Sequence, residues 1–245
     1  MIKLSDRLQV IANLIDKGQT MADIGTDHGF LPLYLFERDI SPKVILADIS
    51  KGSLQKAIDN VEDKACEEEN TDSAFQFRLG NGIEVLEDGE VDIVVIAGMG
   101  GALMTQILGT NLEKSKSFKK IILQPRNAPG KLRFWLQHNG FEIVSENLVR
   151  EGKFICEILE IQPSGNEPGQ DQVQNGQEDD IKYEVPVSLL IRNGDLAIEF
   201  VQRKLNTEIN ILENMGKAVE IDQEKVEKTK QRIDYLQKLL NNEVR

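Results

Sequence analysis

Five short apolar segments alternate with helical segments over the first 140 residues, and this alternation constrains the fold more than any other feature. The segment VDIVVIAG (91–98) is apolar at nearly every position. A strand of this kind has to be covered on both faces, which is typical of a parallel sheet with helices on each side. The pattern predicts an α/β fold with strands at 20–24, 43–48, 75–79, 91–98 and 119–125 and helices that include 50–66, 101–108 and 131–139.

The pattern changes after residue 140. Two extended segments in FEIVSENLVREGKFICEILEIQ meet at Glu151-Gly152 with no helix between them, which predicts a β-hairpin. We therefore expect a parallel sheet that ends in an antiparallel hairpin, within a domain that spans residues 1–162.

The rest of the chain predicts a separate helical part. Residues 163–186 are rich in Gly, Asn, Gln, Asp and Pro, which indicates a polar linker or loop. A break at Asn214-Met215-Gly216 predicts that 187–245 folds back as a hairpin of two helices with a coiled-coil seam. The first helix is marked by Ile198, Val201, Leu205, Ile209 and Leu212. In the second, Val219, Val226, Ile233 and Leu240 fall seven apart, with Thr229 and Leu236 at intervening positions of the heptad.

The composition excludes several classes of protein. No apolar run approaches the roughly 20 residues that cross a bilayer, and the N-terminus lacks the features of an export signal, so we expect a cytoplasmic protein. Cys66 and Cys156 are ninety positions apart, and neither they nor His28 and His138 show zinc-site spacing, so no metal or disulfide is expected. The net charge of −12 disfavours general nucleic-acid binding.

One basic segment departs from the acidic average. Residues 114–133 carry seven cations and no acid, and they flank the last parallel strand. Such a run is usually a solvated face, but at the carboxyl end of a strand it could also contact phosphates. Its cations are Lys114, Lys116, Lys119, Lys120, Arg126, Lys131 and Arg133.

The first strand is followed by the turn GTDHG, which lacks the glycine fingerprint of dinucleotide sites. Asp27 stands where that fingerprint has a glycine to let a pyrophosphate approach the backbone. A carboxylate there would repel a diphosphate. The turn instead suits an adenosine ligand that carries a positive charge and no phosphate, which describes S-adenosyl-L-methionine.

The turns after the next strands agree with this ligand. Asp48 follows the second strand and can accept hydrogen bonds from ribose hydroxyls; Asn81 follows the third and can read an adenine edge; and the IAGMGG segment follows the fourth. Each of these residues could instead be only a helix cap or a turn residue. Because they occur in order at successive strand ends, we favour the interpretation that they bind a ligand. The predicted cofactor-binding residues are Asp23, Gly25, Thr26, His28, Gly29, Asp48, Ile49, Asn81, Gly82 and Gly98.

These motifs carry a family resemblance. DIGTDHGFLP, ADIS, LGNG, IAGMGG and ILQPRNAPGKLRFWL, followed by the hairpin and the C-terminal helices, resemble the bacterial tRNA (adenine-22-N1)-methyltransferases, the TrmK family. The resemblance covers essentially the whole chain. It implies a Rossmann-like class I methyltransferase sheet, a helical C-terminal domain, S-adenosyl-L-methionine as cofactor, and methyl transfer to N1 of a tRNA adenine.

The chemistry of that reaction assigns further roles. N1 of adenine has its own lone pair, so alignment and exclusion of water would provide most of the catalysis. Asp27 is the candidate to stabilise the developing charge, with the backbone of Gly98 and Met99 as the alternative. Met99 or Pro125 is the candidate shelf for the extruded base. The predicted substrate-binding residues are Gln124, Pro125, Arg126, Asn127 and Lys131.

Two other functions fit the sequence. The protein could be a class I methyltransferase that acts on a small molecule or a protein, or a non-catalytic adaptor that binds RNA. Oligomerisation through the C-terminal helices is possible, but the mixed charges of the heptads do not predict it.

Overall fold

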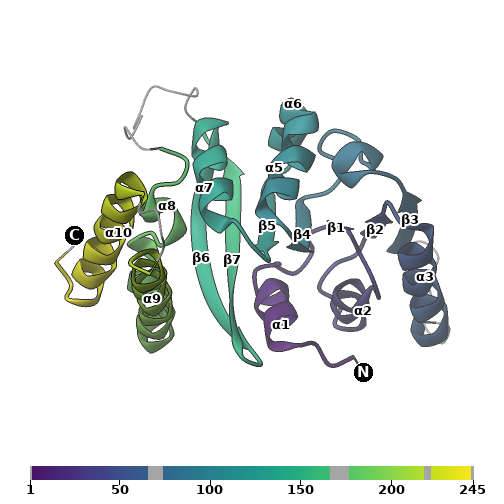
Figure 1. Ribbon diagram of the computed structural model, residues 1–245. Helices are drawn as coiled ribbons and strands as arrows, with labels where there is room; N and C mark the ends of the chain where they lie inside the picture. Colours follow the sequence, from purple (N-terminus) through teal and green to yellow (C-terminus); the bar gives the residue numbers. More distant parts are fainter. Residues whose placement is uncertain (1, 66–73, 166–176, 218–221, 244–245) are drawn as a thin grey trace.

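The computed structural model describes residues 2–65, 74–165, 177–217 and 222–243. Within them, one seven-stranded sheet runs through the molecule, with the order β3-β2-β1-β4-β5-β7-β6 (Figure 1). Strands β1 to β5 are parallel, and β7 pairs antiparallel with both β5 and β6. The predicted parallel sheet ending in an antiparallel hairpin is confirmed. The strands are β1 (Met21–Ile24), β2 (Val44–Asp48), β3 (Phe75–Leu79), β4 (Ile93–Met99), β5 (Lys120–Pro125), β6 (Phe141–Glu151) and β7 (Phe154–Pro163).

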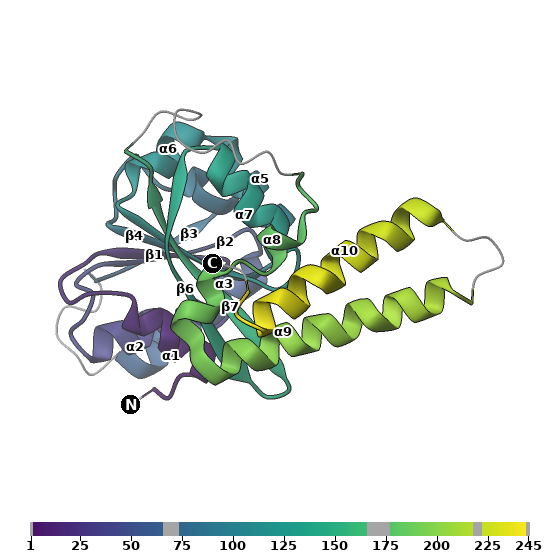
Figure 2. The same ribbon diagram turned by 90° about the vertical axis from the view of Figure 1, so that its left-hand side faces the viewer.

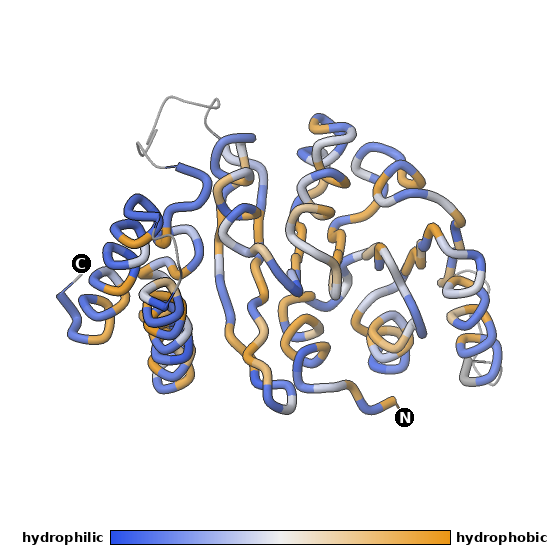
Figure 3. The backbone as a smooth tube through the Cα atoms, in the orientation of Figure 1, coloured by the Kyte–Doolittle hydropathy of each residue, from blue (hydrophilic) through white to orange (hydrophobic). Residues whose placement is uncertain are grey.

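Helices cover both faces of the sheet. One face carries α1 (Asp6–Asn13), α2 (Phe30–Glu37) and α3 (Lys51–Ala65), and the other carries the 3₁₀ helix η1 (Gly82–Val85), α5 (Gly101–Thr110), α6 (Leu112–Ser117) and α7 (Pro129–His138). Side chains of β4 alternate between the two cores: Ile93 and Val95 pack on one side, Val94 and Ile96 on the other. This double burial explains why β4 carries no polar side chain, and the central strands are largely orange in Figure 3.

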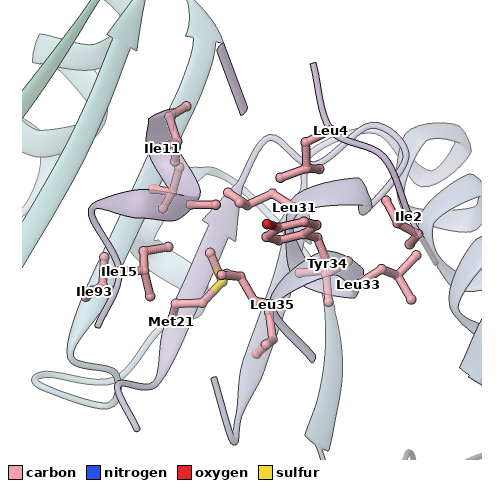
Figure 4. Close-up of a cluster of buried hydrophobic side chains, with 14 of the residues drawn as sticks. Ile2, Leu4, Ile11, Ile15, Met21, Leu31, Leu33, Tyr34, Leu35 and Ile93 are labelled. Carbon is pink, nitrogen blue, oxygen red and sulfur yellow. The ribbon is translucent and has the colours of Figure 1, made fainter. Parts of the chain in front are cut away.

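The core under α1 and α2 is close-packed. Met21 of β1 and Ile93 of β4 meet Ile11 and Ile15 of the α1 region and Leu35 of α2, and all five are buried (Figure 4). Ser5 begins α1, and its hydroxyl accepts a hydrogen bond from the backbone nitrogen of Leu8. This cap fixes the residue at which α1 begins.

The C-terminal helices form an arm that packs on the hairpin. Helix α8 (Ile181–Glu184) leads into α9 (Ser188–Met215), which lies antiparallel to α10 (Gln223–Leu240) (Figure 2). Helix α9 bends at Gly194, which has φ 49° and ψ −133°. Next to the bend, Asn193 accepts a hydrogen bond from the backbone nitrogen of Leu148 in β6. The arm is thus tied to the sheet by polar contacts as well as by apolar packing.

The seam of the arm follows the predicted pattern with two qualifications. Val201, Leu205 and Leu236 are buried between the helices, whereas Ile198 lies on the exposed side of α9. Val219 and Cys66 lie outside the described residues.

The segment expected to be a polar linker contributes to the arm's core. Ile181, Tyr183 and Val185 are buried, because the short helix α8 turns them inward against α7 and α9. The division of the chain at 162 and 186 stays a prediction.

Candidate active site

The turns after β1 to β4 open at one edge of the sheet. β1 lies between β2 and β4, so the chain crosses the sheet in opposite directions on its two sides, and such a switch point is where open α/β sheets bind ligands. Gly25, Gly82 and Gly98 have φ values of +80°, +54° and +76°, in the region that favours glycine. The structure therefore places the predicted cofactor-binding turns along a common edge, with those after β1 and β4 adjacent.

Asp23 at the end of β1 is the most perturbed carboxyl of this edge. Burial raises the pKa of Asp23 to about 6, and the neighbouring Asp48 carboxylate adds to the rise while Arg7 opposes it. An ionised carboxylate in such a place is stabilised by a cation. Asp23 is therefore suited to face the positively charged end of a ligand.

Thr26, in the same turn, has an unsatisfied hydroxyl. Although it is close enough to Asp23 to lower the pKa of that group, its Oγ1 is buried and meets no partner with hydrogen-bond geometry. A buried polar atom without a partner costs free energy. A polar ligand group at this turn would remove that cost.

Asp48 and Ile49 end β2 with complementary chemistry. One carboxylate oxygen of Asp48 accepts a hydrogen bond of 2.6 Å from the backbone nitrogen of Ser50 at the start of α3. Ile49 is 73% exposed, which is unusual for a large apolar side chain next to a strand end. A carboxylate beside an open apolar surface fits the ribose and base of an adenosine.

The glycines of the GMGG segment serve the packing of two loops. The backbone nitrogen of Arg126 donates to the carbonyl of Met99 at 2.7 Å, and that of Gly101 donates to the carbonyl of Asn127 at 3.0 Å. A Cβ on Gly101 would lie 2.5 Å from the carbonyl oxygen of Ala128. At this glycine the close approach is to the protein's own chain rather than to a ligand.

Met99, predicted as a shelf for the target base, lies across the first turn. A Cβ built on Gly25 would be only 2.0 Å from Cε of Met99. Gly25 therefore has to lack a side chain for Met99 to occupy this position. The side chain of Met99 therefore packs the turn after β4 against the turn after β1.

Asp27 and His28 lie toward α3. The Asp27 carboxylate is 3.2 Å from Nζ of Lys56 and 3.2 Å from Nε2 of His28. The His28 ring stacks on Phe30 with centroids 5.2 Å apart, and Asn60 of α3 donates to the His28 carbonyl. The catalytic role of Asp27 stays a prediction. Gly29 follows as the left-handed residue before α2, and Asn81 lies exposed at the start of η1.

Most of the basic run serves the fold. Lys119 pairs with Asp92 and Lys120 with Glu160, and Lys114 donates to a backbone carbonyl of residue 86. Arg133 is 1% exposed and bridges two buried glutamates. For these cations the prediction of phosphate binding is not supported, since sequence spacing cannot show which cations already have partners.

Arg126 and Lys131, predicted to bind the substrate, are exposed. The Arg126 guanidinium makes no hydrogen bond or ion pair among the described residues, and Lys131 has only a 3.8 Å contact with Glu178. Arg126 lies close to the site, because its Nε is 3.9 Å from where a Cβ on Gly98 would be. Asn127 is exposed beside it.

Gln124 and Pro125 are buried, and Gln124 connects three parts of the site. Its Oε1 accepts hydrogen bonds from the backbone nitrogen of Gly98 at 3.1 Å and from Nη1 of Arg7 at 2.8 Å. Arg7 also pairs with Glu151 at the hairpin tip, at 2.7 Å. No local pattern in the sequence points to Arg7, because its partners are 117 and 144 residues away.

A cavity of 720 Å³ adjoins this network. It lies between the loop after β5, the tip of the hairpin and the arm, and its volume is in the range of about 300–1,000 Å³ typical of ligand pockets. Its walls include Gln124, Arg126, Phe154, Glu157 and Lys204. The cavity is linked to the edge at which the predicted cofactor turns converge by Gln124, which lies in its wall and accepts a hydrogen bond from Gly98.

The sheet order and these turns define the class of protein. A mixed seven-stranded sheet with an antiparallel hairpin at one end, and with acids and glycines at the switch point, is a Rossmann-like methyltransferase fold. The family model described as "Methyltransferase domain" matches residues 4–159, and the chain belongs to that family.

Individual relatives agree with the resemblance in the sequence. The chain is 35% identical over 158 residues to a tRNA (adenine(22)-N(1))-methyltransferase of Bacillus subtilis, and the match spans 64% of each chain. It thus covers less than two thirds of that enzyme. The crystal structure of the B. subtilis m1A22 tRNA methyltransferase TrmK has a TM-score of 0.83 at 28% identity, covering 98% of this chain and 100% of that one.

A second solved structure carries a ligand. It is a putative tRNA (m1A22) methyltransferase of Streptococcus pneumoniae in complex with S-adenosyl-L-methionine, with a TM-score of 0.77 at 27% identity, covering 98% of this chain and 100% of that one. The confirmed resemblance therefore extends over the arm as well as the sheet.

Membrane-spanning helices and metal-binding clusters are both absent from the described residues. No helix there combines the length and apolar character that a membrane span requires. No group of three or more His, Cys, Asp or Glu side chains there is arranged to hold a metal ion. The absence of a resident metal stays a prediction.

Proposed function

We propose that this protein transfers the methyl group of S-adenosyl-L-methionine to N1 of an adenine in tRNA, at the position that corresponds to residue 22. The observation that carries the proposal is the acidic switch point: Asp23, half-buried and with a raised pKa, lies between turns that lack the phosphate-binding glycine pattern. The relatives named above support the choice of substrate.

The residues of the switch point fit the cofactor. When bound, it supplies an electrophilic methyl group on a cationic sulfur. Asp23 and the Thr26 hydroxyl would face its charged amino-acid end, and Asp48 would accept hydrogen bonds from its ribose. Ile49 would cover its base. We propose these residues, with the glycines at 25, 82 and 98, as the cofactor site.

The protein's part in the reaction is positional. The bond from the methyl carbon to N1 forms as the bond from that carbon to sulfur breaks, and the adenine later loses a proton from N6. Gln124 orients the Gly98 backbone, and Met99 excludes water from the first turn. A tRNA substrate would place the protein in the cytoplasm.

The test is methyl transfer to unmodified tRNA with labelled S-adenosyl-L-methionine. We expect incorporation at one adenine, located by primer-extension arrest, and its loss when that adenine is replaced by guanine. Methylation of a metabolite pool without any methylation of tRNA would instead support the small-molecule reading. Failure to bind the cofactor in calorimetry would support the adaptor reading.

A further inference from the structure

The hairpin continues past the end of the parallel sheet. β5 pairs with β7 only from Ile121↔Ile161 to Leu123↔Leu159. Residues 154–157 of β7 extend beyond that last pair and line the 720 Å³ cavity, opposite the loop 124–129. The cavity is closed on its third side by Phe200 and Lys204 of α9, so the arm completes a space that the sheet alone leaves open.

Phe154 is an aromatic residue at the tip of the hairpin. It is 63% exposed, lines the cavity, and has Nζ of Lys153 5.2 Å from the centre of its ring. An unstacked nucleobase is the ligand that an exposed ring beside a cation suits, because stacking on an aromatic face contributes about 1–3 kcal/mol per base.

The charges of the cavity leave one cation free. Its three carboxylates are each paired: Glu151 with Arg7, Glu157 with Arg133, and Glu184 with Lys204. Arg126, also in the wall, is the lining cation whose side chain has no hydrogen bond or ion pair among the described residues. The cavity can therefore take an anion at Arg126 without breaking an existing pair.

Arg126 lies on the side of the cavity that is nearest to the predicted cofactor-binding turns. Arg126 Nε lies 3.9 Å from the Cβ position of Gly98, and Gln124 links Gly98 to the cavity wall. A nucleotide with its phosphate at Arg126 would thus have its base within the cavity and beside the end of β4.

We propose that this cavity receives the extruded target nucleotide of the RNA, with the base stacked on Phe154 and a flanking phosphate bound by Arg126. The inference rests on the proposed function, since it names where the substrate of that reaction lies. It makes Phe154 a substrate-contact residue, and it makes the arm part of the substrate pocket.

The test compares Phe154→Ala, Phe154→Trp and Val144→Ala in the full-length protein. Val144 is the matched control, an exposed apolar residue near the other end of the same hairpin. The measurements are kcat and KM for tRNA methylation, the Kd for S-adenosyl-L-methionine, and the Tm. We expect Phe154→Ala to lower kcat/KM for tRNA about 5- to 150-fold, with cofactor affinity and Tm unchanged, and Phe154→Trp to retain most of the activity.

Three results would overturn the inference. In the first, Phe154→Ala methylates tRNA as well as the wild type does. In the second, Phe154→Trp is as impaired as Phe154→Ala, which would mean that stacking is not what the ring provides. In the third, Val144→Ala is equally impaired. Wild-type protein that binds the cofactor but leaves tRNA unmethylated would refute the proposed function itself, and the inference with it.

Discussion

The side-chain oxygen of Gln124 lies 3.1 Å from the backbone nitrogen of Gly98 and accepts a hydrogen bond from it. The same oxygen binds Arg7, so one buried amide fixes the turn after β4 and the first helix together. Replacement of Gln124 by Met would leave two donors unpaired.

We expect Gln124→Met to destabilise the protein by about 1–3 kcal/mol and to lower kcat, because the backbone at Gly98 would no longer be held. Urea unfolding measures the first effect and single-turnover methylation the second. The control is Gln106→Met on α5, whose side chain is exposed. Unchanged turnover in Gln124→Met would show that the hydrogen bond is purely structural.

Asp23 predicts a pH-dependent affinity for the cofactor. Its pKa of about 6 lies above the ordinary 3.8, so the folded protein binds this proton more tightly than the unfolded chain. Ionisation of Asp23 therefore costs stability, and this cost grows as the pH rises from about 4 to about 6. A cationic ligand favours the ionised form, so its binding should release a proton below pH 6.

We expect affinity for S-adenosyl-L-methionine to weaken by up to about tenfold per pH unit below 6, and calorimetry in buffers of different ionisation enthalpy to detect the proton. Asp23→Asn should bind weakly at every pH and, without ligand, be more stable than the wild type at pH 8. A pH dependence that persists in Asp23→Asn would assign it to another group.

The proposed contact of Asp48 with the ribose can be tested through the affinity for the cofactor. Asp48→Asn keeps an oxygen that can accept from Ser50, so α3 should still begin normally. The loss of the charged acceptor should weaken cofactor binding by about 1–3 kcal/mol. Calorimetry checks this, with the exposed Asp88→Asn as control. Equal affinities for the two variants would contradict the placement of the ribose.

Arg126 predicts the salt dependence of tRNA binding. If its guanidinium contacts a phosphate, Arg126→Ala should weaken tRNA binding and reduce the slope of log K against log salt by about one, while cofactor affinity stays the same. Lys119→Ala, which removes a cation already paired with Asp92, should change the slope less. Identical slopes for wild type and Arg126→Ala would show that Arg126 does not contact a phosphate and is only a solvent-exposed cation.

Arg133 predicts a large effect on stability. It donates to Glu146 and Glu157, both at 2.6 Å, and to the carbonyl of Tyr183 at the start of the arm. Removal of one partner from a buried ionic group costs about 3–5 kcal/mol, and we expect this of Arg133→Met.

The added changes Glu146→Gln and Glu157→Gln should restore part of that stability, since neutral amides avoid the uncompensated buried charges. Urea unfolding measures these stabilities. It can be monitored by the fluorescence of Trp135, the single tryptophan, which lies in α7 with Arg133. A triple variant less stable than Arg133→Met would contradict this explanation.

Local patterns in the sequence were sufficient for the elements and the kind of sheet. The apolar strands, the turn at Glu151-Gly152 and the apolar residues at helical spacing in α10 are patterns among neighbouring residues. The structure confirms the strands, the hairpin and the helix that these patterns predict. The acids and glycines at the strand ends could be aligned because parallel strands bring their carboxyl ends to one edge.

What the sequence could not reveal depends on contacts between distant residues. The cations of the basic run look alike along the chain, yet Arg133 is buried against Glu146 and Glu157 while Arg126 stays exposed. Arg7 and Phe154 enter the site region from the first helix and the hairpin tip, far from any motif. The sequence by itself determined the fold and predicted the class of ligand, because period and turn chemistry are local. Only the tertiary structure decided which charges are already neutralised, because ion pairing depends on neighbours that folding brings together.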